Sequence, residues 1–339
     1  MRILSVPGPL NDNPYQRLLY DAVEAAGGTL LEPGGLSGRN LRASDGPGRV
    51  LHVHWLWLKG PRPRRFLRSR RYVRLLKQAG ELGWKRIWTA HNVHAHEGTE
   101  EDRWLSRQLS SNVDGVIVHS REAEDVVRKT YGLRCPVEVI PHGHYRDAYP
   151  KAGSISRDDA RARIGMTSER PMLLAFGQIR PYKGFVDLVE RFATSDLDAT
   201  LVIAGRPMDP ATAATLESAA ASDERIVTDL RFHDPDATAL LFAASDRVVL
   251  PYRRVTTSGT LALALSLERP VVIPDESSLI EACEENAASV YTDLDDMIPA
   301  IRRALDTDRE VGELAAARSA DALAWGPIGE RTVAFMRSL

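Results

Sequence analysis

The chain has 339 residues and a net charge of -2, and 43% of its residues are hydrophobic, 27% charged and 6% aromatic. This composition is that of a globular protein and excludes a disordered or collagen-like chain, and the length suggests two domains. The charge is uneven: residues 1–150 carry 23 Lys and Arg against 16 Asp and Glu, whereas the remainder carries 21 against 30. Taken alone, the near-zero total gives no reason to expect nucleic acid or a membrane as a partner.

Cysteine content and hydropathy bear on location. Only two cysteines occur, Cys135 and Cys283, so we expect no disulfide framework and an intracellular protein. The apolar run at the N-terminus is too short for a signal peptide, and no uncharged apolar stretch is long enough to span a bilayer. We therefore expect a cytoplasmic protein.

In the first half, short apolar runs rich in β-branched residues alternate with segments of helical period. The predicted strands are Arg2–Val6, Val50–Leu58, Arg86–His91, Gly115–His119 and Val137–Pro141. The predicted helices are Pro14–Ala26, Arg70–Leu82, Glu101–Ser110 and Ser120–Tyr131. Such alternation predicts a parallel α/β sheet.

A polar, turn-rich segment, Tyr149–Ser156, reads as a linker, after which the alternation restarts. The predicted strands are Met172–Phe176, Ala199–Ala204, Ile226–Leu230, Arg247–Pro251 and Pro270–Pro274. The predicted helices are Phe185–Ala193, Pro210–Ala221, Pro235–Ala244, Thr260–Leu267, Ser277–Glu284 and Leu294–Leu305. The fold class is therefore α/β, with two Rossmann-like domains that bind ligands at the carboxyl ends of their strands.

Two segments of the second half suit a diphosphate. FGQIRPYKG, residues 176–184, places Arg180 and Lys183 in a turn between a strand and a helix. TTSGTL, residues 256–261, places hydroxyls and a glycine where an apolar helix begins. Helix N-termini and cations both favour phosphate. A solvated turn and a plain helix cap are the alternative interpretations.

Histidines gather near two predicted strand ends. TAHNVHAHE, residues 89–97, holds His91, His94, His96 and Glu97, and His52 and His54 follow another strand. The cluster has three open interpretations: a metal site, a general base at His96 or Glu97, or imidazoles that bond sugar hydroxyls. Histidines satisfied inside the core are the fourth.

Two further segments of the first half stand out. IPHGHY, residues 140–145, brings His142 and His144 to a strand end beside the linker. Residues 59–74 carry eight positive charges and no acid, with Phe66, Leu67 and Tyr72 among them. Such a stretch suits an anionic membrane or a phosphate-bearing acceptor, and equally a solvated basic face.

With these segments placed, nearly the whole chain resembles the GT-B glycosyltransferases, in the group that includes the retaining family 4 enzymes. FGQIRPYKG, VIAGRP, LLFAASDRVVLPY and LALALSLERPVVIPDESSLIE look like the donor-domain elements of that group. TAHN, VIVHS and VIPHGHY match the first-domain strands, and AWGPIGERTVAFMRSL the last helix. The chain departs from the pattern at Val255 and Leu263, where the group usually carries two glutamates.

The resemblance implies two domains with parallel sheets that face each other across a cleft. Residues 1–150 with a crossing helix, 325–339, would bind the acceptor, and residues 151–324 the nucleotide sugar. The implied site residues are: for catalysis Glu97, His96 and His91; for the donor diphosphate Arg180, Lys183, Ser258, Gly259 and Thr260; for the nucleotide or sugar Gly177, Arg206, Thr257 and Glu281; and for the acceptor His142, His144 and Tyr145. No metal and no cofactor is implied.

The implied function is hexosyl transfer from a UDP- or GDP-linked sugar to a hydroxyl of a saccharide or lipid-linked saccharide, in polysaccharide or glycoconjugate biosynthesis. The enzyme would work in the cytoplasm, with peripheral contact to the membrane through residues 59–74. One alternative is a metal-dependent hydrolase that uses His52, His54, His91, His94 and His96. The other is a nucleotide-sugar-binding protein without activity, which the missing glutamates keep open.

Overall fold

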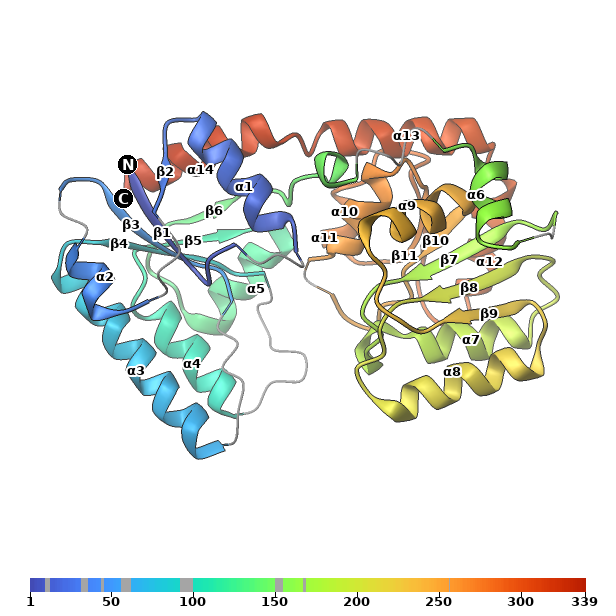
Figure 1. Cartoon of the computed structure of the whole chain (residues 1–339), viewed down its shortest axis with the longest axis horizontal. Coiled ribbons are helices and arrows are strands. Elements are labelled where there is room, and N and C mark those ends of the chain that lie inside the picture. Colours follow the sequence, from blue (N-terminus) through green and yellow to red (C-terminus); the bar gives the residue numbers. More distant parts are fainter. Residues whose placement is uncertain are drawn as a thin grey trace. The chain divides into compact units, whose positions relative to one another are not determined.

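The computed structural model describes residues 1–9, 13–31, 36–43, 46–55, 62–91, 100–149, 155–166, 169–255 and 257–339. The chain divides into two compact units. The first unit comprises Met1–Gly143 and Ala324–Leu339, and the second comprises His144–Leu323. Each unit is built on a parallel six-stranded sheet covered by helices (Figure 1).

The sheet of the first unit has the strand order β2-β1-β3-β4-β5-β6, and every neighbouring pair is parallel. Its strands are β1 (Arg2–Val6), β2 (Thr29–Leu30), β3 (Arg49–Val53), β4 (Lys85–Thr89), β5 (Gly115–Val118) and β6 (Val137–Val139). The central strands are buried apolar runs, as expected of a sheet with helices on both faces. Their carboxyl ends meet at one edge.

Among the described residues, the helices of this unit are α1 (Tyr15–Ala25), α2 (Gly38–Ala43), α3 (Arg62–Glu81), α4 (Glu100–Ser110), α5 (Arg121–Tyr131) and α14 (Trp325–Ser338). In Figure 1, α1 and α14 lie side by side over one face, and α3 and α4 lie below the other. Helix α5 begins where the Ser120 side chain accepts a hydrogen bond from the Ala123 N–H, and it ends at Gly132 in the left-handed conformation.

The C-terminal helix α14 belongs to the first unit because of close backbone contacts. A Cβ at Gly329 would lie 2.5 Å from the carbonyl oxygen of Ala22, so only glycine lets α14 approach α1 so closely. At the other end, the ring of Phe335 packs against Gly115 of β5. Segments about 300 residues apart in sequence thus share one core.

The sheet of the second unit has the order β12-β11-β10-β7-β8-β9, again all parallel. Its strands are β7 (Met172–Phe176), β8 (Thr200–Ala204), β9 (Ile226–Asp229), β10 (Arg247–Val249), β11 (Val271–Pro274) and β12 (Ala288–Tyr291). The helices are α6 (Arg157–Arg163), α7 (Phe185–Ala193), α8 (Pro210–Ser222), α9 (Pro235–Ala244), α10 (Gly259–Ser266), α11 (Ser277–Ile280), α12 (Met297–Asp306) and α13 (Arg309–Asp321). Helices α7 and α8 lie below this sheet in Figure 1.

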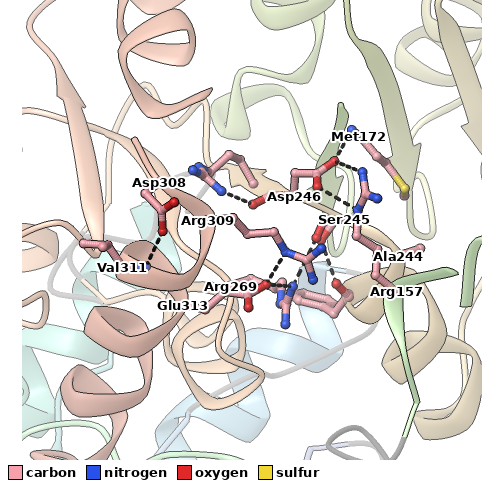
Figure 2. A network of polar contacts seen from close by, with 12 residues as sticks. Arg157, Met172, Ala244, Ser245, Asp246, Arg269, Asp308, Arg309, Val311 and Glu313 are labelled. Carbon is pink, nitrogen blue, oxygen red and sulfur yellow. Dashed lines mark hydrogen bonds and ion pairs between the residues drawn. The ribbon is translucent and has the colours of Figure 1, made fainter. Parts of the chain in front are cut away.

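A buried ionic network ties several of these elements together (Figure 2). Asp246 accepts hydrogen bonds from Arg157, from Arg161 at 2.6 Å and from the Met172 N–H at 2.6 Å. Arg269, which is also buried, pairs with Glu313 of α13 at 2.5 Å. Charges removed from water are tolerated only when paired in this way, so the network holds α6, β7, β10 and α13 in one arrangement.

The structure differs from the sequence prediction in places. Helix α3 begins at Arg62, eight residues before the predicted start, so most of the basic segment is helical. The sequence pattern does not predict β2, β12, α2, α6 and α13, because these elements are short or carry little periodic hydrophobicity. No helix among the described residues has the length and apolarity needed to cross a membrane.

Candidate active site

The turn from β7 to α7 carries the first predicted phosphate segment. Gly177 follows β7 with φ +125°, and a short 3-10 helix, Pro181–Lys183, leads to Gly184 at φ +69°. Desolvation is the largest cause that lowers the pKa of Lys183, and the neighbouring Arg180 adds to it. Lys183 forms no salt bridge among the described residues. An arriving anion would relieve both effects.

The turn from β10 to α10 carries the second segment. The Ser258 side chain accepts a hydrogen bond from the Leu261 N–H at 3.0 Å and so caps α10. The Tyr252 hydroxyl is 3.0 Å from the Ser258 Oγ, and Thr260 also hydrogen-bonds Tyr252. These bonds fix the first turn of an otherwise apolar, buried helix.

The two segments meet at Gly177. A Cβ at this position would lie 3.2 Å from the Thr260 Oγ1 and 3.3 Å from the Lys183 Nζ. The Lys183 Nζ also lies 5.5 Å from the centre of the Tyr252 ring. A glycine, a cation and a hydroxyl at a helix N-terminus thus surround one point at the carboxyl edge of the sheet, which is the chemistry that holds a phosphate.

The loops around this point are clamped. The guanidinium of Arg253 donates two hydrogen bonds to the Asp187 carboxylate, both at 2.6 Å, and the Arg253 N–H donates to the Tyr182 carbonyl at 3.1 Å. A Cβ at Gly184 would lie 1.8 Å from the Pro251 carbonyl oxygen. A Cβ at Gly205 would lie 1.8 Å from the Gly177 carbonyl oxygen. These close backbone approaches require glycine.

Other residues predicted for the donor are more dispersed. The Arg206 side chain is exposed, and its backbone carbonyl accepts a hydrogen bond from the Ile179 N–H at 2.9 Å. Glu281 is exposed at the end of α11, and Thr257 precedes the cap of α10. Leu263 is 6% exposed inside α10, so this position of the group pattern holds an apolar core side chain.

In the first unit, hydrogen bonds join the described histidines with Tyr20 of α1. The Tyr20 hydroxyl lies 2.9 Å from the His52 Nδ1 and 2.8 Å from the His54 Nε2. The His52 Nε2 lies 2.7 Å from the Thr89 Oγ1. His91 lies between two rings, with its Nε2 3.1 Å from the His54 Nδ1 and its Nδ1 3.2 Å from the His119 Nε2.

The cluster is neutral because it is buried. Desolvation is the largest cause that lowers the pKa of His52 to about 3 and that of His119 to about 4. It also holds the pKa of His54 and His91 well below the usual value. A histidine with so low a pKa is a weak base. Both ring nitrogens of His91 are used within the cluster, which the sequence analysis did not anticipate.

His142 belongs to the same region. Its Nδ1 donates to the Gly143 carbonyl at 2.9 Å, and its ring centre lies 4.6 Å from that of Tyr15. Tyr15 also contacts His91 and Trp325, which brings α1 and α14 against the strand ends. No motif in the sequence indicates that Tyr15, Tyr20 and His119 join this region.

His144 and Tyr145, predicted to bind the acceptor with His142, lie in the second unit instead. The His144 N–H donates to the Leu323 carbonyl, and the Tyr145 N–H donates to the Ser266 Oγ at 2.7 Å. The Tyr145 hydroxyl lies 3.3 Å from where a Cβ at Gly259 would stand. Tyr145 therefore packs against α10, beside the predicted phosphate site.

Some predictions fall outside the described residues: Glu97, His96 and His94. Within the part of the chain that the structure describes, no three histidine, cysteine or acidic side chains are arranged to hold a metal ion. His52, His54 and His91 instead bond Tyr20, Thr89 and neighbouring histidines.

Comparison with known proteins establishes the family. Residues 170–307 match the model described as Glycosyl transferases group 1. Two proteins of Xanthomonas campestris pv. campestris, each named GDP-mannose:glycolipid 4-beta-D-mannosyltransferase, are 34% and 33% identical over 281 and 282 residues. Each alignment covers 81% of this chain and 73% of the relative. The chain belongs to the group 1 glycosyltransferases. It transfers a sugar from a nucleoside-diphosphate donor, and nothing found supports the hydrolase alternative.

Solved structures confirm the predicted fold of this glycosyltransferase. Sucrose-phosphate synthase from Thermosynechococcus elongatus has a TM-score of 0.73 at 17% identity, covering 99% of this chain and 98% of that one. Anabaena HepE in complex with UDP has a TM-score of 0.70 at 13% identity, with both chains fully covered. At these identities the likeness concerns the fold alone, and that fold is GT-B.

Proposed function

We propose that this glycosyltransferase transfers mannose from GDP-mannose to a hydroxyl of a lipid-linked saccharide. The two Xanthomonas relatives are named for this donor and for a glycolipid acceptor, and they support the choice over UDP-sugars. The observation that carries the proposal is the convergence of Lys183 and Thr260 on Gly177, which offers a diphosphate a cation, a hydroxyl and a helix N-terminus.

In the second unit, Lys183, Arg180 and the N-terminus of α10 would hold the two phosphates. As the bond between the anomeric carbon and the diphosphate breaks, negative charge grows on the leaving oxygen. Preorganised cations and N–H groups stabilise that charge and so lower the barrier. Ser258, Gly259 and Thr260 form the cap of α10 and would contact the same group, with Gly177 leaving room for it.

In the first unit, the carboxyl edge of β3, β4, β5 and β6 would receive the acceptor. The acceptor oxygen forms a bond to the anomeric carbon, GDP leaves with the bonding electrons, and the hydroxyl proton passes to a base. The relatives are named for a beta product, and because mannose is alpha-linked in GDP-mannose, we propose inversion. Glu97 or His96 would then take the proton.

The exposed side of α3 is a candidate membrane contact. Phe66 is 42% exposed and Leu67 is 66% exposed. The centre of the Phe66 ring lies 6.2 Å from the centre of the Trp104 ring of α4. Exposed cations surround them: Arg64, Arg68, Arg70, Arg71, Arg74 and Lys77. Basic side chains around apolar ones favour an anionic lipid surface, where a lipid-linked acceptor is found. We propose that the enzyme is peripheral to the cytoplasmic face.

Turnover tests this function. Purified enzyme and a glycolipid fraction are incubated in three separate reactions, each with one donor: GDP-mannose in the first, UDP-glucose in the second and UDP-galactose in the third. We expect release of GDP, and mannose in the lipid fraction, only in the first reaction. Lys183→Met should abolish most of this turnover, whereas Lys129→Met on the exposed side of α5 should not. Turnover of a UDP-sugar with none of GDP-mannose would overturn the donor proposal.

A further inference from the structure

One continuous line of hydrogen bonds runs across the carboxyl ends of β3, β4 and β5 and ends on a backbone carbonyl. In order along the line, its members are Thr89, His52, Tyr20, His54, His91, His119 and the Ile140 carbonyl. In each imidazole of the line, one ring nitrogen bonds the preceding member and the other bonds the next member. The position of one proton therefore decides the position of the next.

The last member sets the direction. The carbonyl oxygen of Ile140 can only accept, so the His119 Nδ1, 2.8 Å away, must carry the proton. The Nε2 of a neutral His119 then has a lone pair and accepts from the His91 Nδ1. His91 consequently has a bare Nε2.

The same logic continues along the line. The bare His91 Nε2 accepts from the His54 Nδ1, and the bare His54 Nε2 accepts from the Tyr20 hydroxyl. The Tyr20 oxygen accepts from the His52 Nδ1, and the His52 Nε2 accepts from the Thr89 hydroxyl. With every ring neutral and protonated at Nδ1, each nitrogen in the line is satisfied and none is left over.

Adding a proton to His91 or His119 would break this arrangement, because two N–H groups would then face each other. Among the described residues, no charged side chain bonds to the line. Its described ring neighbours are Tyr15, Trp55 and His142, and the charge interactions that lower the pKa of His52, His54 and His91 come from other histidines.

We propose that the Ile140 carbonyl, acting through His119, fixes His91 as a neutral ring protonated at Nδ1, and that His119 is a positioning residue for glycosyl transfer. The proposal rests on the proposed function only in placing the acceptor at this edge. There, the line, most of whose members are buried, fixes the orientation of the His91 ring without placing a charge at this edge of the sheet. The cations needed for the diphosphate remain in the second unit.

Nitrogen NMR of the whole protein with ring-labelled histidine tests the proton positions directly, without substrate. We expect His52, His54, His91 and His119 to be protonated at Nδ1. His233 provides an internal reference for a ring protonated at Nε2, because its Nε2 donates to the Asp229 carboxylate at 2.9 Å. Protonation of His91 or His119 at Nε2 in the wild type would overturn the proposal.

Two variants test the direction of the line. In Tyr20→Phe, His52 loses the acceptor for its Nδ1 proton and should change to Nε2–H, which donates to Thr89, while His54, His91 and His119 stay unchanged. In His119→Phe, the anchor is lost, so His91, His54 and His52 should change together. Tyr72→Phe is the matched control, since the buried Tyr72 hydroxyl has no hydrogen-bond partner among the described residues.

Kinetics then separate positioning from packing. His119→Phe should lower kcat about tenfold with KM for the donor nearly unchanged, because the orientation of His91 is lost. Tyr72→Phe should keep kcat within about twofold, because its hydroxyl lies outside the line. Equal kcat losses in both variants, or a rise confined to KM, would overturn the positioning role. Absence of all turnover with GDP-mannose would instead count against the proposed function, while the NMR result would stand.

Discussion

The ammonium of Lys183 lies 5.5 Å from the centre of the Tyr252 ring, and Tyr252 in turn bonds the serine that caps α10. The cation and the helix N-terminus are thus held by the same aromatic side chain. Since desolvation already disfavours the charged ammonium, the site gains when an anion arrives. This relationship supports the proposed donor site.

Two glycine substitutions distinguish an effect on ligand binding from an effect on the stability of the fold. Gly205→Ala should destabilise the second unit strongly, because its Cβ would lie 1.8 Å from the Gly177 carbonyl oxygen. Gly177→Ala meets only side-chain atoms, so beyond the strain of φ +125° it should act mainly by weakening GDP binding. Thermal unfolding and calorimetry check both. Gly165→Ala, at φ +74° with no atom near its Cβ, measures the cost of a left-handed backbone without a clash, about 1–2 kcal/mol.

The five clustered histidines predict loss of stability in acid. Burial lowers the pKa of His52 and His142 to about 3 and that of His119 to about 4, and it holds His54 and His91 well below their usual value. The unfolded chain binds protons near pH 6.5, whereas the folded chain does not. Stability is therefore full above that pH and falls below it, by up to about 1.4 kcal/mol per pH unit for each histidine.

Thermal unfolding between pH 7.5 and pH 4.5 measures this effect. Carboxylates with lowered pKa, such as Asp114 and Asp229, act in the same direction, but only near and below pH 4. A midpoint temperature that stays constant from pH 7 to pH 5 would contradict the buried, neutral cluster.

The buried network of Figure 2 predicts a large effect at one carboxylate. Asp246→Asn leaves Arg161 without its counter-charge, and Arg161 is only 6% exposed. Breaking such a pair costs about 3–5 kcal/mol, visible as a lower midpoint in urea. Asp198→Asn removes an exposed partner of Arg170 and should cost under about 1 kcal/mol. Similar losses in the two variants would refute the distinction.

The membrane contact predicts a charge-dependent association. Replacing Arg64, Arg68, Arg71 and Arg74 by glutamine should reduce sedimentation with vesicles that contain anionic lipid, by about 1 kcal/mol per charge near the surface. The control replaces Arg191, Arg231, Arg302 and Arg318 of the second unit, which changes the net charge equally. If both sets sediment alike, α3 is not the contact.

The place in the fold of the two segments predicted to hold the diphosphate could be read from sequence, because the rule for parallel sheets is local. FGQIRPYKG and TTSGTL each follow an apolar strand, so both had to lie at the carboxyl edge. The rest depended on tertiary register. Tyr20 lies on a helix and meets His52 and His54 only after β1 and β3 pair, and no periodicity in the sequence indicates this.

Local reasoning also misplaced Tyr145. Its position one residue after His144 suggested a role beside His142, but the chain passes from one unit to the other between Gly143 and His144. The boundary is set by packing: a Cβ at Gly143 would lie 2.4 Å from the Trp325 ring. A contact between residues so distant in sequence cannot be found from a motif.

Calorimetric titration of GDP tests the central claim most directly. The wild type and Lys129→Met should bind GDP alike and more tightly than UDP. Lys183→Met should bind GDP about 10- to 100-fold more weakly, because a charged contact to phosphate contributes about 1.5–3 kcal/mol. Equal GDP affinity in Lys183→Met and the wild type would contradict the donor site described for this glycosyltransferase.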